Sequence, residues 1–88
     1  MLFLISVRMQ EKDLDQALAV KLKGNEKFKS NEFEEARKLY TEAIGICPPH
    51  RKSELSIIFQ NRAAANEKME MLEEAVKDCS ESIKLNNK

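Results

Sequence analysis

The sequence predicts an all-α fold in which four antiparallel helices form two helix-turn-helix units. Apolar residues recur at three- and four-residue steps, as they do along one face of a helix. The chain also matches itself when it is shifted by 39 residues, so that small residues align with small ones and most large apolar residues with apolar ones. The aligned pairs are Val20 and Phe59, Gly24 and Ala63, Phe33 and Leu72, Ala36 and Ala75, Tyr40 and Cys79, Ala43 and Ser82, and Ile44 and Ile83. A repeat of this period is typical of a solenoid, whose stacked units offer a surface to another chain.

The first helix is predicted from about Glu11 to Ser30, because this segment is rich in the helix formers Ala, Leu, Lys, Glu and Gln. Residues 1–13 are expected to form an apolar N-terminal extension that packs on a helix or on a partner subunit. Asn31 is predicted to cap the second helix, with Glu34 reaching back to the free backbone N–H groups.

The second helix is expected to end at about Cys47, because Pro48 follows and cannot continue a helix. Ser53 is predicted to cap a third helix. The buried face of that helix is predicted to hold Leu55, Ile58, Phe59, Ala63 and Met69. A fourth helix is defined by Ala75, Val76, Cys79, Ile83 and Leu85.

The outer face of the fourth helix is expected to be left apolar around Val76, Cys79 and Ile83. Three units are usually needed for a stable stack, so something should cover this face. Either residues 1–13 fold across it, or two copies of the chain associate through it. We prefer a homodimer, formed through this face or through the apolar N-terminal segment.

Length and composition suit one small domain of 88 residues, with 42% hydrophobic and 34% charged side chains. Fifteen Lys and Arg balance fifteen Asp and Glu, so the long-range field that attracts nucleic acid is missing. No nucleic-acid partner is therefore expected. The lysines of the first helix should form a solvated face, because Glu26 interrupts them and aromatic residues that stack on single strands are lacking. They are Lys21, Lys23, Lys27 and Lys29.

The opening run from Met1 to Val7 is apolar but short. A membrane span needs about 20 such residues, and a signal peptide needs a charged start and a cleavage site. We therefore expect no membrane span. Cys47 and Cys79 lack the spacing of a metal site and are expected to be reduced thiols that fill the core, which favours the cytoplasm.

The chain is not expected to be an enzyme, and no catalytic, metal or cofactor site is predicted. His50 is the only histidine and lies in the loop after Pro48, so a histidine-based catalytic or metal site is hard to build. Gly24 and Gly45 are the only glycines, so there is no glycine-rich loop for a phosphate.

Residues at characteristic offsets in the first unit are Gly24, Phe28, Phe33, Ala36, Tyr40, Ala43 and Pro48, and those in the second are Ala63, Leu72, Ala75 and Ile83. With these residues the chain resembles the tetratricopeptide repeat family. One repeat lies at about residues 17–50 and another at about 56–88, inside a domain of residues 14–88. The second repeat departs from the family at Asn66 and Glu67, where large apolar residues are usual, and it lacks the closing proline.

Gly24 lies inside the first predicted helix. A glycine there costs about 1 kcal/mol relative to alanine. Its absent side chain is therefore expected to let a neighbouring helix approach closely, through Ala36.

Two strings resemble a subgroup of this family more specifically: Lys21-Leu22-Lys23-Gly24-Asn25 and Asn61-Arg62-Ala63-Ala64-Ala65. That subgroup binds the acidic C-terminal tails of the 70- and 90-kDa heat-shock chaperones and holds the terminal carboxylate in a carboxylate clamp. The resemblance implies a co-chaperone adaptor in which Lys21, Asn25 and Asn61 bind a peptide carboxylate. Lys21 and Asn25 lie four residues apart and so share a helix face, and a cation beside an amide donor suits a carboxylate.

The resemblance also implies that the clamp is incomplete. The subgroup takes a further Lys and Arg from a third repeat, which this sequence does not contain. Charged hydrogen bonds contribute about 1.5–3 kcal/mol apiece, so this chain alone is expected to bind such tails weakly or not at all. The alternative interpretation is a helical oligomerisation element that binds no peptide tail.

Overall fold

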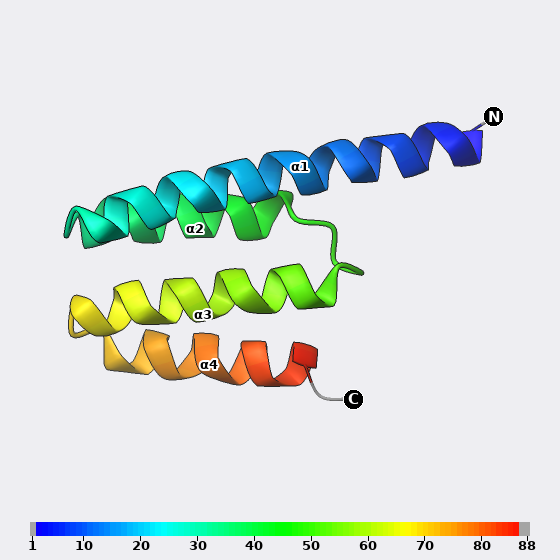
Figure 1. Cartoon of the computed structure of the whole chain (residues 1–88). Coiled ribbons are helices and arrows are strands. Elements are labelled where there is room, and N and C mark those ends of the chain that lie inside the picture. The colour runs from blue at the N-terminus through cyan, green and yellow to red at the C-terminus, as the bar shows by residue number, and fades with distance from the viewer. Residues whose placement is uncertain (1, 87–88) are drawn as a thin grey trace.

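Four helices form the fold: α1 (Leu2–Lys29), α2 (Phe33–Ile46), α3 (Lys52–Lys68) and α4 (Leu72–Asn86). They lie side by side in chain order, each antiparallel to the next, as two stacked hairpins (Figure 1). The computed structural model describes the helical backbone of residues 2–86 and the side chains of residues 11–86. The prediction of an all-α fold with two helical hairpins is confirmed. Within this described part, no helix combines the length and the apolar character that a membrane span requires.

Helix α1 begins at Leu2 and not at about Glu11, as the sequence had suggested. Residues 2–10 contain neither proline nor glycine, so nothing in them stops a helix. The predicted packing of the N-terminal segment on a helix or a partner concerns side chains outside the described residues.

The two hairpin turns have the same geometry, 39 residues apart. Asn31 and Glu70 both adopt the left-handed conformation, with φ values of 63° and 60°. At the first turn the N–H groups of Asn31 and Glu32 donate to the carbonyl oxygens of Phe28 and Lys27, at 3.0 and 2.9 Å. The corresponding bonds at the second turn measure 3.0 and 2.8 Å. This pair of bonds is the Schellman motif, which ends a helix by satisfying its last carbonyl groups.

Both predicted N-terminal caps are wrong. Asn31 ends α1, and the residue before α2 is Glu32, which makes no capping bond through its side chain. Ser53 lies inside the first turn of α3, which begins after Arg51. The Arg51 N–H donates to the Pro48 carbonyl oxygen at 3.0 Å, so the loop closes as a β-turn at Arg51 and the helix starts directly after it.

The core between the hairpins consists largely of small side chains. Its buried members are Ala17, Val20, Ala36, Tyr40, Ala43, Cys47, Ile58 and Ala65. Cys47 is confirmed as a core residue, but the same prediction for Cys79 is wrong because its side chain is exposed. Ala75, Asp78 and Ser82 are the buried residues of α4 and occupy its side toward α3. The predicted apolar outer face of α4 is confirmed, since Val76 and Ile83 are 64% and 69% exposed.

The predicted close approach of a neighbouring helix at Gly24 is confirmed, and the nearest atoms belong to the Tyr40 ring where Ala36 was expected. A Cβ atom built at Gly24 would lie 2.7 Å from Cε1 and 2.9 Å from Cδ1 of Tyr40. The ring is only 2% exposed. The missing side chain therefore makes room for the aromatic ring of α2 beneath α1.

The contact between α3 and α4 is unusually polar. The buried hydroxyl groups of Ser56 and Ser82 lie 2.7 Å apart and share a hydrogen bond. Gln60 Nε2 donates to Ser82 Oγ at 2.9 Å, and Asn86 Nδ2 donates to Ser56 Oγ at 2.6 Å. Ser82 aligns with the buried Ala43 of the first repeat, so hydrogen bonds here take the place of apolar contacts.

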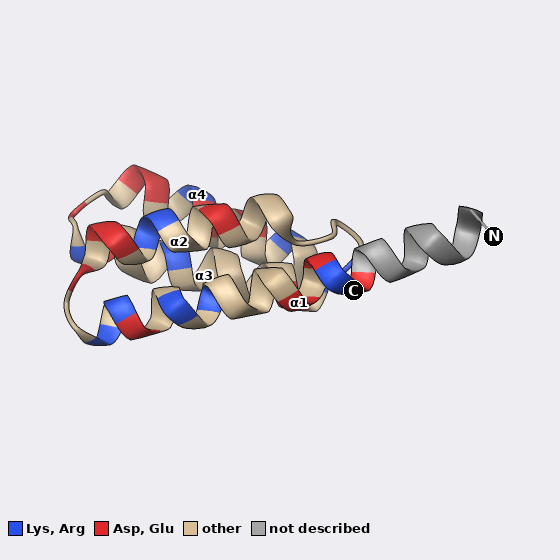
Figure 2. Cartoon of the chain, turned by 90° about the horizontal axis from the view of Figure 1, so that it is seen from above, with Lys and Arg blue, Asp and Glu red and all other residues tan. Residues whose placement is uncertain are grey.

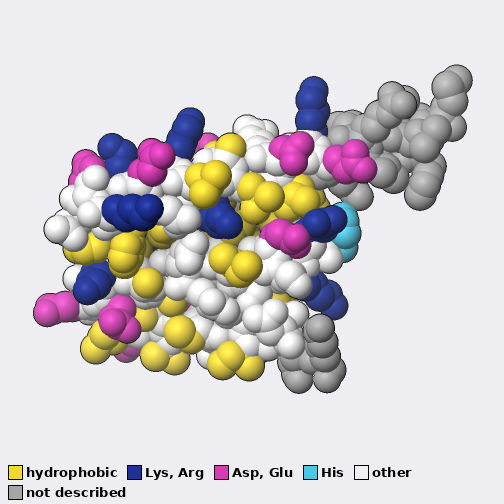
Figure 3. Space-filling view, in the orientation of Figure 1, with side chains coloured by type: hydrophobic (Ala, Val, Ile, Leu, Met, Phe, Trp, Pro, Cys, Tyr) yellow, Lys and Arg dark blue, Asp and Glu magenta, His cyan; other side chains and the backbone are white. Residues whose placement is uncertain are grey.

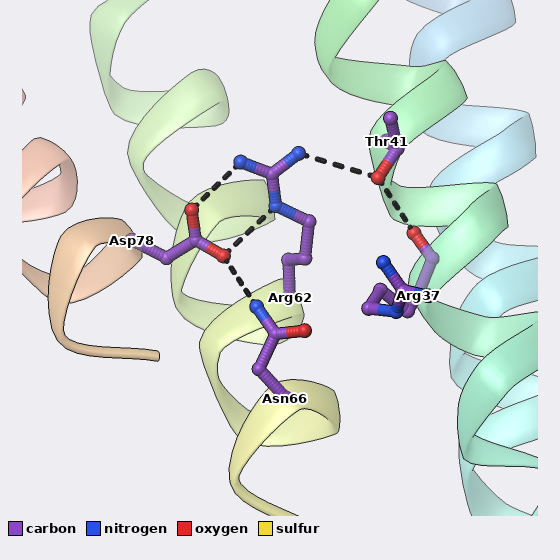
Figure 4. A network of polar contacts seen from close by, with 5 residues as sticks. All are labelled: Arg37, Thr41, Arg62, Asn66 and Asp78. Carbon is purple, nitrogen blue, oxygen red and sulfur yellow. Dashed lines mark hydrogen bonds and ion pairs between the residues drawn. The ribbon is translucent and has the colours of Figure 1, made fainter. Parts of the chain in front are cut away.

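A second polar network ties α3 to both of its neighbours (Figure 4). Arg62 donates from Nε and Nη2 to the two oxygens of Asp78 at 2.8 and 2.7 Å, and from Nη1 to Thr41 Oγ1 at 3.2 Å. The Thr41 hydroxyl in turn donates to the Arg37 carbonyl oxygen at 2.9 Å. Asn66 Nδ2 donates to Asp78 Oδ2 at 2.9 Å, which explains why an amide stands where the family usually has an apolar residue.

Gly24→Ala should lower stability by about 1–3 kcal/mol, because the new methyl group overpacks a buried ring. This loss should appear even though alanine is the better helix former. Gly45→Ala is the matched control, since no atom lies within 4 Å of its Cβ position, and it should raise stability by up to about 1 kcal/mol. Urea unfolding followed by circular dichroism measures both. Equal gains at the two positions would refute the close packing at Tyr40.

Glu70→Gly should raise stability by about 0.5–1 kcal/mol. A side chain in the left-handed conformation costs roughly 1–2 kcal/mol, and glycine loses part of this gain through its freedom in the unfolded chain. Glu42→Gly, at an exposed site inside α2, makes the same chemical change and should cost about 1 kcal/mol. Thermal unfolding compares the two, and a loss at both sites would contradict the turn geometry.

Asp78→Ala should cost about 3 kcal/mol, because it removes three hydrogen bonds and leaves the half-buried Arg62 without a carboxylate partner. Glu74→Ala, one turn earlier on the same helix and exposed, should change stability by less than about 0.5 kcal/mol. Chemical denaturation of both variants tests this. Similar effects at the two positions would show that the network does not hold α4 in place.

Candidate functional site

The main candidate site is a cavity of about 420 Å³ between the first helices of the two hairpins. Its walls come chiefly from α1 and α3, and α2 adds the buried Tyr40. The residues of α1 and α3 that line it are Leu22, Asn25, Glu26, Phe28, Lys29, Asn61 and Ala64. Two of the three residues predicted to bind a carboxylate, Asn25 and Asn61, therefore face the same space from different helices.

Asn25 and Asn61 are joined by a hydrogen bond. Asn61 Nδ2 donates to Asn25 Oδ1 at 3.2 Å, and the Tyr40 hydroxyl donates to the same oxygen at 2.6 Å. The carbonyl oxygen of the Asn25 amide is thus occupied by two donors from within the fold. Its NH₂ group makes no hydrogen bond to another described side chain and can donate into the cavity.

The Tyr40 hydroxyl and the Asn61 NH₂ group together hold this amide. Burial raises the pKa of the Tyr40 phenol above the usual value, so the hydroxyl keeps its proton at neutral pH. A flipped Asn25 would bring its NH₂ group against the NH₂ group of Asn61. The pair therefore presents N–H groups to a ligand, which suits an acceptor such as a carboxylate oxygen.

Lys21 lies one helical turn before Asn25 on α1 and is half-buried. It does not line the cavity, and no hydrogen bond joins it to Asn25 or Asn61 among the described residues. The structure therefore brings the two amides together and leaves the lysine one turn away on the same helix.

Lys29 and Tyr40 are site residues that the sequence analysis did not assign. Lys29 is exposed, as expected for a solvated lysine face, and it also lines the cavity one turn after Asn25. Its four-residue spacing from Asn25 is a signal that could have found it. No local pattern reports the contact of Tyr40 with Asn25, because the two residues lie 15 positions apart on different helices.

Charge is mixed over the surface. Figure 2 shows basic and acidic residues interspersed along the helices, with short acidic stretches at the starts of α2 and α4. Among the side chains from residue 11 to 86, no group of three His, Cys, Asp or Glu residues is placed to hold a metal ion. The cavity therefore combines amide donors and apolar walls with one basic and one acidic side chain, those of Lys29 and Glu26.

Comparison with known proteins places this geometry in a family. Residues 22–50 match the family model described as tetratricopeptide repeat. The chain is 42% identical over 80 residues to mitochondrial import receptor subunit TOM70 of Rattus norvegicus, covering 91% of this chain and 13% of the relative. It is 39% identical over 69 residues to DnaJ homolog subfamily C member 7 of Mus musculus, covering 78% and 14%. It is 38% identical over 78 residues to Hsp70-Hsp90 organizing protein 1 of Glycine max, covering 86% and 13%.

The pair Cys47-Pro48 and the run from Glu54 to Ala65 suggest a likeness to two proteins, tetratricopeptide repeat protein 1 and the mitochondrial outer-membrane import receptor. The likeness to the import receptor is confirmed. The chain spans only 13–14% of the length of the three relatives. The repeat fold and these relatives indicate a protein-interaction module. The matched repeat, the paired helical hairpins and the relatives together show that the chain belongs to the tetratricopeptide repeat family.

Proposed function

We propose that the cavity between α1 and α3 binds the C-terminal carboxylate of an acidic chaperone tail, with Lys21, Asn25 and Asn61 as the binding residues. The hydrogen bond between the two amides carries this proposal, because it sets N–H donors from two helices around one space. A carboxylate accepts hydrogen bonds and cannot donate them, so it complements these donors.

Charge on α1 supports the same ligand. Lys21 and Lys29 lie four residues before and after Asn25, so both share its face of the helix. A cation near an amide donor strengthens the binding of a carboxylate, and a charged hydrogen bond contributes about 1.5–3 kcal/mol. Lys21 and Lys29 favour acidic side chains in the residues that precede the terminal carboxylate, whereas Glu26, which also lines the cavity, offsets part of their charge.

The names of two relatives support the class of partner. One is called Hsp70-Hsp90 organizing protein 1, and another is a heat shock protein sti1 homolog of Schizosaccharomyces pombe, 40% identical over 73 residues. We therefore propose the tails of 70- and 90-kDa heat-shock chaperones as ligands. Because the clamp of this subgroup also uses a Lys and an Arg of a third repeat, these 88 residues alone should bind such a tail weakly.

Titration with an acidic peptide that ends in aspartate and a free carboxylate tests the proposal. Asn25→Ala and Lys21→Ala should each weaken binding by about tenfold or more at low salt, and amidation of the peptide's end should do the same. Lys23→Ala is the matched control, because Lys23 is an exposed lysine of α1 that lies two residues from Asn25 and so does not share its helix face, as Lys21 does. It should leave the affinity within about twofold. Fluorescence anisotropy of a labelled peptide gives these values.

Affinity that ignores both Lys21→Ala and peptide amidation would refute the carboxylate clamp. Affinity that falls equally with Lys23→Ala would show a non-specific attraction to basic residues. The alternative function, an oligomerisation element without a peptide ligand, predicts no saturable binding of the peptide at any salt concentration. Increasing salt should weaken a true clamp, because ions screen the lysine charges.

A further inference from the structure

A second cavity, of about 540 Å³, is lined by residues of α2, α3 and α4. None of these residues also lines the cavity between α1 and α3. The polar network around Arg62 lies within it (Figure 4). The proposed binding of a chaperone tail makes no use of this second cavity.

The outer face of α4 takes no part in the second cavity. The exposed Val76 and Ile83 of that face are not among the lining residues. Figure 3 shows hydrophobic side chains along the lower edge of the molecule, where Figure 1 places α4. The residues of α4 that do line the cavity are Glu74, Lys77, Asp78 and Glu81. The two hairpins therefore form this cavity by themselves, whatever covers the outer face of α4.

Two buried polar atoms of the cavity residues have no hydrogen-bond partner in the described part of the chain: Arg37 Nε and Asn66 Oδ1. Asn66 is only 2% exposed. Its orientation is fixed, because its NH₂ group donates to a carboxylate oxygen of Asp78, which can only accept. The Asn66 oxygen is therefore turned away from Asp78 and toward the side of α2 that carries Arg37 (Figure 4). One donor and one acceptor thus await a partner in the same cavity.

The charges around the cavity are balanced. Three basic and three acidic side chains line it: Arg37, Arg62, Lys77, Glu74, Asp78 and Glu81. Arg62 and Asp78 already neutralise each other through two hydrogen bonds. A charged ligand of either sign would meet like charges on the rim, so an uncharged ligand is favoured.

The two unpartnered atoms select the chemistry of that ligand. Buried polar groups are nearly always hydrogen-bonded, and an unsatisfied one is costly. A carboxylate would satisfy Arg37 but would set an acceptor against the Asn66 oxygen, whereas an ammonium group would satisfy Asn66 and leave Arg37 unpaired. A carboxamide carries both an acceptor and a donor. The cavity is also much larger than a water molecule, which occupies about 30 Å³, so it can admit a side chain.

We propose that this cavity binds a glutamine side chain of a partner protein. The glutamine oxygen accepts a hydrogen bond from Arg37 Nε, and its NH₂ group donates to Asn66 Oδ1. The half-buried ring of Phe59, with the Arg62 guanidinium 5.4 Å from its centroid, gives the CH₂ groups of the glutamine an apolar contact. Glutamine is favoured over asparagine because its longer side chain reaches the buried Asn66. No terminal carboxylate is needed, so this site is independent of the carboxylate clamp.

Nuclear magnetic resonance titration of the isotope-labelled chain with the peptide acetyl-Gly-Gln-Gly-amide tests the proposal. The signals of the Arg37 Nε–H and of the Asn66 NH₂ group should shift together along one saturable curve that extends to millimolar concentrations. Replacing the glutamine of the peptide by glutamate or by methionine should weaken binding by about fivefold or more, because each lacks the donor for Asn66. The three peptides share the same main chain and nearly the same side-chain length, so the comparison isolates the carboxamide.

Variants of the chain test the donor. Arg37→Met keeps an apolar chain of similar length but removes the donor, and it should weaken binding of the glutamine peptide by about fivefold or more. Lys38→Met is the matched control, because it removes a positive charge from the next position of α2, which is exposed and does not line the cavity. It should leave the affinity within about twofold. Asn25→Ala, in the other cavity, should also leave it unchanged, so the outcome does not depend on the clamp.

Four results would overturn the proposal. The first is the absence of a saturable shift at Arg37 and Asn66 with the glutamine peptide. A glutamate peptide that binds as tightly would show a site for anions, and a methionine peptide that binds as tightly would show a contact with the main chain or with apolar groups. The fourth is an Arg37→Met variant that keeps its helical circular dichroism spectrum and its full affinity. The peptide comparisons hold even if that variant fails to fold.

Discussion

The close packing of Gly24 on the Tyr40 ring is the constraint on which the rest of the structure depends. A side chain at position 24 would collide with the ring. Helix α1 can therefore pack closely on α2 only because residue 24 is a glycine. The same approach brings the Tyr40 hydroxyl beneath Asn25, the next residue along α1. The contact that packs α1 on α2 therefore also places the Tyr40 hydroxyl within hydrogen-bond distance of the Asn25 amide. Asn61 reaches this amide from α3, so the second hairpin meets the first at the candidate site.

The two hairpins are held by different forces. In the first, burial of apolar groups such as Ala36, Tyr40 and Ala43 removes hydrocarbon from water. In the second, the buried positions of α4 include Asp78 and Ser82, whose polar atoms are satisfied by Arg62 and Ser56. A buried carboxylate is costly unless it is paired, and here both of its oxygens are used. The cavity between α1 and α3 thus lies between one apolar and one polar hairpin.

Features that depend on periodicity could be predicted from the sequence. Features that depend on one contact between residues far apart in the sequence could not. The helical steps and the 39-residue shift predict four helices, two hairpins and the open face of α4. They also predict that α1 and α3 are neighbours, which brings Asn25 and Asn61 together. They do not predict the Tyr40 bond to Asn25 or the burial of Asp78, because each partner lies on another helix. The cap predicted at Asn31 failed because the residue that caps one helix can equally end the one before it.

The hydrogen-bonded contact between α3 and α4 has a thermodynamic consequence. Exposure of apolar surface raises the heat capacity on unfolding, whereas exposure of polar surface lowers it. The contact built on Ser56, Ser82 and Asp78 exposes much polar surface when it opens. This contact therefore adds less to the heat-capacity increment than an apolar contact of the same area would, and it makes the stability of the chain change more gently with temperature.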